Sequence, residues 1–529
     1  MKIKISAFLQ NLFFYLYVLT AATVFAIVLF LHDGMEYAGK INLPLPTWLL
    51  LLAAAVFALL VSAFVQKFRT GLEERFSRLN PAAFFVLLFL AHLYICYNCY
   101  FETGWDVDKL MPYSFRLADG YLVDEHRLYY FQRFPNNALI TWLFSLFIRV
   151  SRYVGVLDVE QSPYMAIITV QCALASLTGY LVYRAAFHFW KTRRAAWLAA
   201  FFYCALVGLS PWAMIPYSDA MGLAIPMLVL SVYISMGNRR RLPLKWAAMG
   251  FLAYLGYRIK PQCAICVIAV GIIEAAELLK EERFWLGLRR RAASLLAMAV
   301  VFVMCAFAFS QILLPSMAIT PDKEMEFGPT HFFMMGLNNA SDGSFYGVDS
   351  DFSAKIDTAA ERSRRNMEVA MQRIADYGPQ GLLLHTAKKT LVNFGDGTFA
   401  WGREGNFYKM VFEPKNRFIS PLLRNLYYNT GAYYSLFAVF EQAVWLFTLF
   451  APLGLLFAKR GKTDKVTLAL MLSILGLTMF ETLFEARARC LYTYAPYFVL
   501  LACAGWKNSW SRLCTLRLRT GKPKPVESR

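Results

Sequence analysis

Long apolar stretches separated by short polar segments run through most of the chain. A transmembrane α-helix needs roughly 20 mainly apolar residues, and thirteen stretches approach that length. They cover residues 8–31, 47–66, 81–98, 136–156, 162–187, 195–212, 219–236, 244–258, 261–278, 292–314, 433–457, 466–485 and 488–506. The pattern predicts an all-α polytopic membrane protein.

The composition strengthens this prediction. Hydrophobic residues make up 58% of the chain and charged residues only 17%, whereas a soluble domain is roughly half apolar and about a quarter charged. The first apolar stretch follows Lys2 and Lys4. It is too long for the core of a signal peptide, and no clear small-residue cleavage site follows it. We therefore expect a retained first span with a cytoplasmic N-terminus.

Short basic clusters between the apolar stretches predict the topology, because Lys and Arg concentrate in cytoplasmic loops. If 136–156 crossed the membrane, all clusters after the first would lie outside. If it does not, every cluster lies inside, and Arg149, Arg152 and Gly155 make this segment a poor span. We predict about twelve spans, both termini in the cytoplasm and 136–156 as a helix on the outer face. The clusters are Lys67/Arg69, Lys191/Arg193/Arg194, Arg239/Arg240/Arg241/Lys245, Arg289/Arg290/Arg291, Lys459/Arg460/Lys462/Lys465 and Arg517/Arg519/Lys522/Lys524.

These clusters also account for the net charge of +19, so no nucleic-acid partner is expected. The predicted domains are an N-terminal part with two additional spans (1–80), a transmembrane core (81–314) with an external loop (99–161), an external segment (315–432), three C-terminal spans (433–506) and a basic cytoplasmic tail (507–529).

The 315–432 segment is the only sizeable hydrophilic piece. Between residues 315 and 430 it has thirteen acidic and thirteen basic residues, so it carries no net charge. Apolar residues at helical spacing predict one helix over 353–376 that stops at Tyr377-Gly378-Pro379, and a second over 380–394 that runs into Gly395-Asp396-Gly397. We expect a mainly helical lid or acceptor platform.

Several charged residues fall on the predicted outer face. Asp106 and Asp108 follow Gly104-Trp105, and a spacing of two points them to opposite sides in extended backbone, so one should face a pocket. Asp219 follows Tyr217 at the start of a span, where it could cap the helix, line a pocket, or do both. Positive charge is disfavoured outside, so the basic residues here either extend to the membrane interface or bind an anion such as a lipid-linked phosphate. They are Arg258, Lys260, Arg487 and Arg489.

Cysteine usage leaves three interpretations open. Cys96/Cys99 and Cys263/Cys266 have CxxC spacing, which suits packing, disulfides or a metal, but the pairs lie too far apart for an ordinary zinc module. Other cysteines lie within apolar stretches and are interpreted as small apolar residues; these are Cys172, Cys204, Cys305 and Cys503.

Strings spread from about residue 100 to 495 resemble the GT-C superfamily of membrane glycosyltransferases, and in particular a mannosyltransferase-like subgroup from Gram-positive bacteria. Gly104-Trp105-Asp106 is similar to that superfamily's external catalytic loop, and Tyr217-Ser218-Asp219 to its second acidic motif. Five further strings carry the resemblance: Tyr130–Asn137, Lys260-Pro261, His331–Asn338, Asp396–Gly402 and Glu485–Arg489. In this chain the Asp loop follows the third span rather than the first.

The resemblance implies a GT-C fold with external juxtamembrane helices, and it implies that the protein lies in the cell membrane. It implies inverting transfer of a sugar from a polyprenyl-phosphate donor to a glycan, glycolipid or wall-polymer acceptor on the outer face. Asp106 is the expected base because it follows Gly-Trp directly, and Asp108 is a second candidate. The expected substrate-binding residues are Tyr217, Asp219, Arg133, Asn136, Arg258, Lys260, His331, Arg487 and Arg489.

No cofactor is expected to be required, although Asp106 with Asp108 or Asp219 could hold a divalent cation. His331 could be a structural residue or a substrate contact. Three rival functions are a polymerase or ligase using polyprenyl-diphosphate oligosaccharides, a flippase for lipid-linked sugars, and a non-catalytic scaffold in wall assembly.

Overall fold

The computed structural model describes residues 2–122, 125–155, 162–237, 241–458 and 463–520. Within these ranges the chain is mainly helical, with two short strands, which confirms an all-α polytopic membrane protein. Nine helical segments are long and apolar enough to cross a bilayer. These are Lys4–Leu31, Thr47–Lys67, Pro81–Cys99, Met165–Trp190, Ser218–Ser235, Pro261–Leu278, Phe284–Ser316, Tyr434–Phe457 and Lys465–Leu483.

The helices that form these segments are α1 (Lys2–Leu31), α2 (Thr47–Lys67), α4 (Pro81–Cys99), α8 (Met165–Trp190), α10 (Ser218–Gly222) with α11 (Ala224–Ser235), α13 (Ile265–Leu278), α14 (Phe284–Ala308) with α15 (Leu314–Ser316), α20 (Tyr434–Phe450) and α21 (Lys465–Leu483). The other three predicted spans contain α9 (Arg193–Tyr203), α12 (Leu242–Ile259) and α23 (Ala495–Thr520). The α9 segment is shorter than predicted, because it ends in a π-helical turn at Cys204–Gly208.

The remaining elements lie between the spans. They are the helices α3 (Arg69–Arg78), α5 (Val107–Ala118), α6 (Glu125–Arg133), α7 (Asn137–Val154), α16 (Pro329–Gly336), α17 (Gly347–Ala354), α18 (Ala359–Phe394), α19 (Ile419–Tyr427) and α22 (Arg489–Tyr492), and the strands β1 (Phe101–Thr103) and β2 (Tyr408–Val411).

Helix α7 corresponds to the apolar stretch that we did not expect to span. One face of it is buried and includes Ile140, Phe144 and Ile148, whereas Tyr153 near its C-terminus is exposed. It packs against α5, α8 and α12. This one-sided burial is typical of an amphipathic helix that lies against a bundle.

Helix α18 contains the predicted break. Gly378 adopts φ 56°, ψ −179°, and Pro379 follows it, so α18 is two helices joined at a kink. The first begins at Ala359 rather than at 353, because residues 347–354 belong to α17 and the Thr358 hydroxyl accepts a hydrogen bond from the Glu361 amide as an N-cap.

A two-stranded antiparallel sheet was not predicted. β1 directly follows α4, and Phe101 pairs with Val411 of β2 across some 300 residues of sequence. The Phe101 ring is fully buried against Tyr408 and Tyr428. The sheet ties the end of α4 to the external segment, and this tie positions the loop that follows β1.

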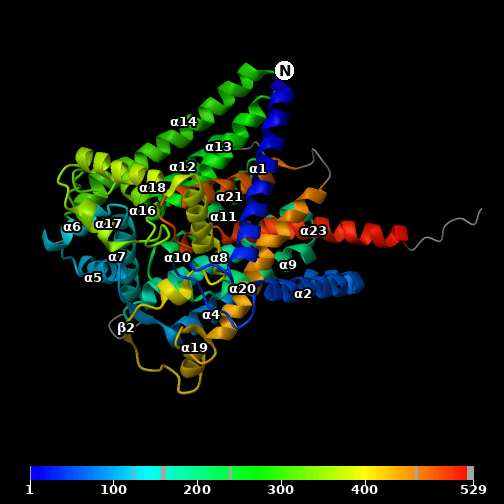
Figure 1. Ribbon diagram of the computed structural model, residues 1–529, viewed down its shortest axis with the longest axis horizontal. Coiled ribbons are helices and arrows are strands. Elements are labelled where there is room, and N and C mark those ends of the chain that lie inside the picture. Colours follow the sequence, from blue (N-terminus) through cyan, green and yellow to red (C-terminus); the bar gives the residue numbers. More distant parts are fainter. Residues whose placement is uncertain (1, 123–124, 156–161, 238–240, 459–462, 521–529) are drawn as a thin grey trace, which may run out of the picture.

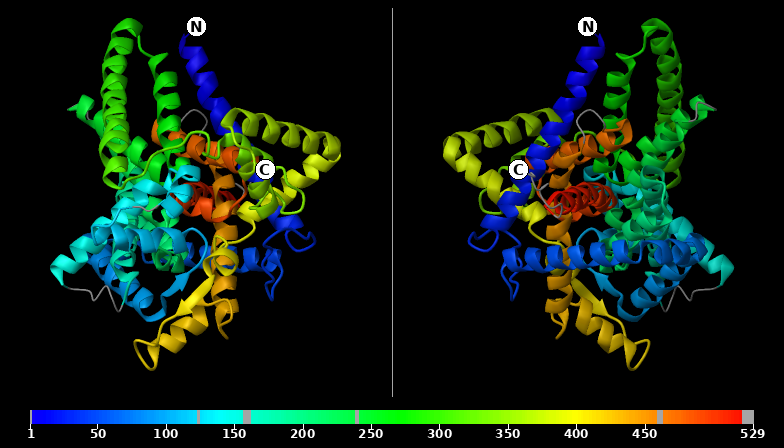
Figure 2. Two further views of the ribbon diagram at one scale, coloured as in Figure 1. Left: turned by 90° about the vertical axis from the view of Figure 1, so that its left-hand side faces the viewer. Right: turned by 90° about the vertical axis from the view of Figure 1, so that its right-hand side faces the viewer.

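Four of the helices from the predicted external segments lie together at one side of the molecule. Figure 1 shows α5, α6, α16 and α17 together on the left, with the N-terminus at the top and the far end of α23 at the right. Figure 2 shows α13, α14 and the start of α1 rising at one end, while β2 and α19 project at the other.

One cavity contains members of two predicted basic clusters, together with the acidic residues Glu274 and Glu281. The basic residues are Arg290 and Arg291 of α14 and Lys465 of α21. Several members of the predicted basic clusters fall outside the described residues, as does the end of the 99–161 loop; these are Arg239, Arg240, Lys459, Arg460, Lys462, Lys522, Lys524 and residues 156–161.

Candidate functional site

A cavity of about 470 Å³ lies where α10 begins and α12 and α21 end, beside the external helices. Its walls come from the loop after β1, the start of α10, the end of α12, α16, and the link between α21 and α22. Eight of the eleven residues predicted for the site line it: Asp106, Asn136, Tyr217, Asp219, Lys260, His331, Arg487 and Arg489.

The loop after β1 aims Asp106 into this cavity. The Gly104 amide donates to the Phe407 carbonyl, so the loop continues the pairing of the sheet. Trp105 then takes φ 45°, a left-handed conformation that costs a residue with a Cβ roughly 1–2 kcal/mol. The turn brings Asp106 to the start of α5, where its backbone carbonyl accepts from the Leu110 amide.

Two phenols hold the Asp106 carboxylate. The Tyr130 hydroxyl donates to Oδ1 at 2.8 Å, and the Tyr217 hydroxyl donates to Oδ2 at 2.7 Å. Burial, together with the negative charge of Asp106, raises the pKa of each tyrosine well above the usual tyrosine value. Both hydroxyls therefore stay protonated and can donate. A carboxylate offers about four acceptor positions, so this arrangement leaves room for a further proton donor.

A chain of amides extends this network. The Asn136 side chain donates to Asn137 Oδ1, and Asn137 Nδ2 donates to the Tyr130 hydroxyl at 2.6 Å. Asn136 lines the cavity and Asn137 is buried at the start of α7. The network therefore positions Asp106 through the Tyr130–Asn137 string.

The opposite part of the site is cationic. Lys260 Nζ donates to Asp219 Oδ1 in an ion pair between two buried side chains. Burial lowers the pKa of Lys260, but the adjacent Asp219 carboxylate outweighs this effect, so the pKa is raised and the ammonium persists. Asp219 lies in the first turn of α10, and its side chain does not act as an N-cap; an ion pair takes the place of that predicted role.

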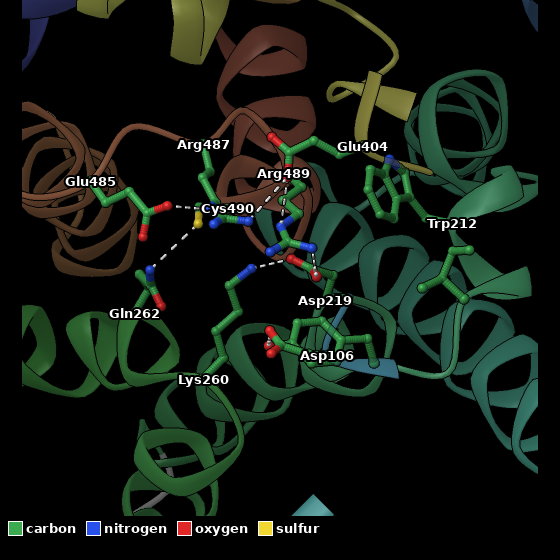
Figure 3. Close-up of polar contacts among 12 residues, drawn as sticks. Asp106, Trp212, Asp219, Lys260, Gln262, Glu404, Glu485, Arg487, Arg489 and Cys490 are labelled. Carbon is green, nitrogen blue, oxygen red and sulfur yellow. Dashed lines mark hydrogen bonds and ion pairs between the residues drawn. The ribbon is translucent and has the colours of Figure 1, made fainter. Parts of the chain in front are cut away.

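Arg489 lies between the Asp106 network and the Lys260–Asp219 ion pair. Its guanidinium lies 4.6 Å from the Trp105 ring and 5.3 Å from the Tyr217 ring, within cation–π range. Nη1 of Arg489 is 3.9 Å from Asp219 Oδ2. Figure 3 shows Lys260 and Arg489 converging on Asp219, with the Asp106 carboxylate beside them.

Carboxylates of the chain itself pair with the remaining positive charge. Arg487 Nε lies 2.6 Å from Glu485, and its Nη1 is 3.4 Å from Glu404. Arg489 Nε lies 3.1 Å from the same Glu404 oxygen (Figure 3). Internal carboxylates therefore already contact these cations, and the binding of an external anion stays a prediction.

Three predicted site residues do not reach the cavity. Asp108 forms an ion pair with Lys409 at the surface. The Arg133 guanidinium stacks on Tyr129 and donates weakly to a backbone carbonyl. Arg258 donates to the Pro135 carbonyl at 2.8 Å and stacks on the Phe309 ring, so it joins α12 to the start of α7.

His331 lines the cavity from α16. Its Nδ1 lies 2.8 Å from the Ser353 hydroxyl, and its ring packs on Phe327 with centroids 4.3 Å apart. Burial lowers the pKa of His331 to about 4, so the imidazole is neutral near pH 7. His331 therefore contacts Ser353 and Phe327 within the protein and also lines the cavity.

Sequence reasoning missed several lining or supporting residues. Tyr130 begins the Tyr130–Asn137 string that carries the resemblance, so it could have been predicted. Nothing in the sequence around Glu404 predicts its role, because it contacts Arg487 across some 80 residues. The other missed feature is an apolar side of the cavity, formed by Tyr257, Ile259, Phe480 and Phe484.

The open questions about metals and thiols receive partial answers. Both Asp106 oxygens accept from phenols, Asp108 contacts Lys409 and Asp219 contacts Lys260. All ten cysteines lie within the described ranges and are free thiols, so neither CxxC pair is a disulfide in this structure.

The fold and the site together define an integral membrane protein with a polar, charged cavity at one end of its helical bundle. The chain belongs to the family described as "conserved hypothetical integral membrane protein", whose model matches residues 2–510. No curated protein matches the chain, and no solved structure matches it.

Proposed function

We propose that the protein is a glycosyltransferase that uses a polyprenyl-phosphate sugar at the outer face of the cell membrane. The observation that carries this proposal is the composition of the cavity. One wall holds a carboxylate, a second holds a group of cations, and a third is apolar and formed by helix ends. A lipid-linked phosphosugar combines the same three chemical characters.

The proposed reaction is a single displacement. Asp106 takes the proton of the acceptor hydroxyl, the acceptor oxygen attacks the anomeric carbon, and the bond from that carbon to the phosphate oxygen breaks. The products are the inverted glycoside and polyprenyl phosphate. The Tyr130 and Tyr217 hydroxyls orient the carboxylate, and its remaining acceptor positions are available to the acceptor hydroxyl.

Lys260, Arg487 and Arg489 would bind the phosphate and stabilise the charge that it gains as it leaves. The contacts of Arg487 and Arg489 with carboxylates use Nε and Nη1. A guanidinium carries five N–H donors, so each can bind a further anion without losing its carboxylate. The internal carboxylates then keep the cations in place when no donor is bound.

The apolar wall suits the start of a polyprenyl tail. Phe480 and Phe484 lie one turn apart on and after α21, with ring centroids 4.9 Å apart, and Tyr257 and Ile259 face the cavity from α12. These residues lie at the ends of apolar helices, which is where a lipid chain would pass from the bilayer to the polar site.

Purified protein in lipid nanodiscs, given a panel of polyprenyl-monophosphate sugars and wall-polymer acceptors, tests the proposal. We expect release of polyprenyl phosphate with a product of inverted anomeric configuration. Consumption of a polyprenyl-diphosphate oligosaccharide alone would instead identify a polymerase or ligase. Movement of an intact donor between leaflets would identify a flippase.

A cellular experiment identifies the acceptor. Mass spectrometry of envelope polymers from cells lacking the protein should show that one sugar decoration has disappeared. Its return with the wild-type chain but not with Asp106→Asn would connect that decoration to the cavity. Its return with Asp106→Asn would point to a non-catalytic scaffold.

A further inference from the structure

A cluster of metal-binding side chains lies between α4 and α8, apart from the cavity. His92 and Cys96 are four residues apart, so both lie on one face of α4, and Cys172 faces them from α8. Each of the three side chains is at most 1% exposed. A ring nitrogen of His92 and the two Sγ atoms all lie within 4.8 Å of one another, and the two sulfurs are 3.8 Å apart.

The hydrogen bonding of His92 fits a ligand. Its Nε2 lies 3.0 Å from the Ser210 carbonyl oxygen, so Nε2 carries the proton and donates it. This assignment leaves the lone pair on Nδ1, which is buried and has no hydrogen-bond partner among the described residues other than the neighbouring Cys172 thiol. Buried polar atoms are normally paired. Histidines that bind metals typically donate their other N–H to a carbonyl or carboxylate.

We propose that His92, Cys96 and Cys172 bind a soft metal ion, Zn²⁺ or Cu⁺, through Nδ1 and two thiolates. The spacing suits it, because two thiolates on a tetrahedral zinc with bonds of about 2.3 Å lie about 3.8 Å apart. Two thiolates also cancel the charge of Zn²⁺, which matters in the interior of a membrane protein. Binding releases the two thiol protons to solvent, so charge and atoms balance.

This site would stabilise the loop that carries Asp106. Cys96 is three residues before the end of α4, and β1 begins at Phe101. A metal that joins Cys96 to Cys172 fixes the end of α4 against α8, and with it the direction in which β1 leaves the bundle. The proposal does not depend on the proposed function, because it concerns metal content and stability.

Metal analysis of the full-length protein tests it. The protein is purified without a metal-affinity step, and zinc and copper are measured by inductively coupled plasma mass spectrometry. We expect about one equivalent of one of the two metals per chain, and its loss in Cys96→Ser and His92→Leu. Cys266→Ser is the matched control, because Cys266 is equally buried and its Sγ donates to the Cys263 carbonyl, a bond that serine can replace.

A second measurement does not require the variants to fold. Wild-type protein is stripped with a membrane-permeable chelator and reloaded with Co²⁺. Thiolate-to-cobalt charge-transfer absorption and recovery of the melting temperature would support the site. Absence of both metals with no such absorption would overturn the proposal. So would a Cys96–Cys172 disulfide found by mass spectrometry of alkylated, unreduced protein.

Discussion

Two lysine–aspartate pairs lie close to the loop after β1, and they differ in how far water reaches their side chains. Lys260–Asp219 lies in the cavity wall with side chains 7% and 2% exposed, while Lys409–Asp108 lies beside the two-stranded sheet with side chains 54% and 33% exposed. Water screens the second pair. In the first, both charges have lost their hydration and depend on each other.

The difference shows what each pair can contribute. An exposed pair is worth about 0–1 kcal/mol, whereas removing one partner of a buried pair leaves an uncompensated charge and costs about 3–5 kcal/mol. The same contrast separates Asp106 from Asp108. Asp106 lies in the cavity between two phenols, and Asp108, two residues later, binds a surface lysine.

The largest expected effect separates these two carboxylates. Asp106→Asn keeps the shape but removes the base, so glycosyl transfer should fall by about 10²–10⁴-fold, with melting temperature and abundance unchanged. Asp108→Asn is the matched control and should leave the rate within about twofold, because Asp108 does not line the cavity. Full activity of Asp106→Asn would refute the assignment of the base.

The next effect concerns the stability of the buried pair. Lys260→Met leaves Asp219 with the more distant Arg489 and Arg487, and the free energy of unfolding should fall by about 3–5 kcal/mol. The double variant Lys260→Met/Asp219→Asn should recover more than half of this loss, since the unpaired charge is gone. Both are measured by denaturant titration in detergent. A double variant as unstable as the single one would contradict the explanation.

A pH effect follows from His331. Its pKa of about 4 in the folded protein lies below the ordinary value of 6.5, so between these values the unfolded chain binds more protons. Stability should therefore fall by about 3 kcal/mol as the pH drops from 6.5 to 4.

The variant His331→Gln tests this effect, because it keeps a polar side chain in contact with Ser353 but does not titrate. Thermal melting of both proteins between pH 4 and 7 should show a smaller loss in the variant. If the melting temperatures of both proteins fell equally with pH, other groups would be responsible for the acid sensitivity.

The smallest effect is expected at the exposed pair. Lys409→Ala should change the free energy of unfolding by less than about 1 kcal/mol, and raised salt should reduce this further. A loss as large as that of Lys260→Met would show that the surface pair helps to hold β1 against β2 and would remove the contrast between the two pairs.

Sequence patterns correctly predicted the elements that depend mainly on neighbouring residues. Nine of the apolar stretches became helices of spanning length, 136–156 became the amphipathic helix α7, and α18 breaks at Gly378-Pro379. Each result follows from the chain's own periodicity or from the conformational limits of glycine and proline. Prediction was poorer at π-helical turns and short linking helices, where tertiary contacts outweigh propensity.

The cavity could be foreseen only in part. Its cations and acids were found because charge at the end of an apolar helix is conspicuous in sequence. Their partners were not, since the contact of Arg487 with Glu404 depends on how distant segments pack. The same holds for Cys172, which appeared to be an ordinary apolar residue until α8 placed it beside His92 and Cys96.

The sequence by itself determined that this protein is a helical membrane protein, and it indicated which polar residues share one end of the bundle. Hydrophobic periodicity and charge distribution are sums over neighbouring residues, so they can be evaluated along the chain. Only the tertiary structure decided that Asp106 faces the cavity and Asp108 does not. That choice rests on β1 pairing with β2 and on the left-handed turn at Trp105, contacts and geometry that no local pattern specifies.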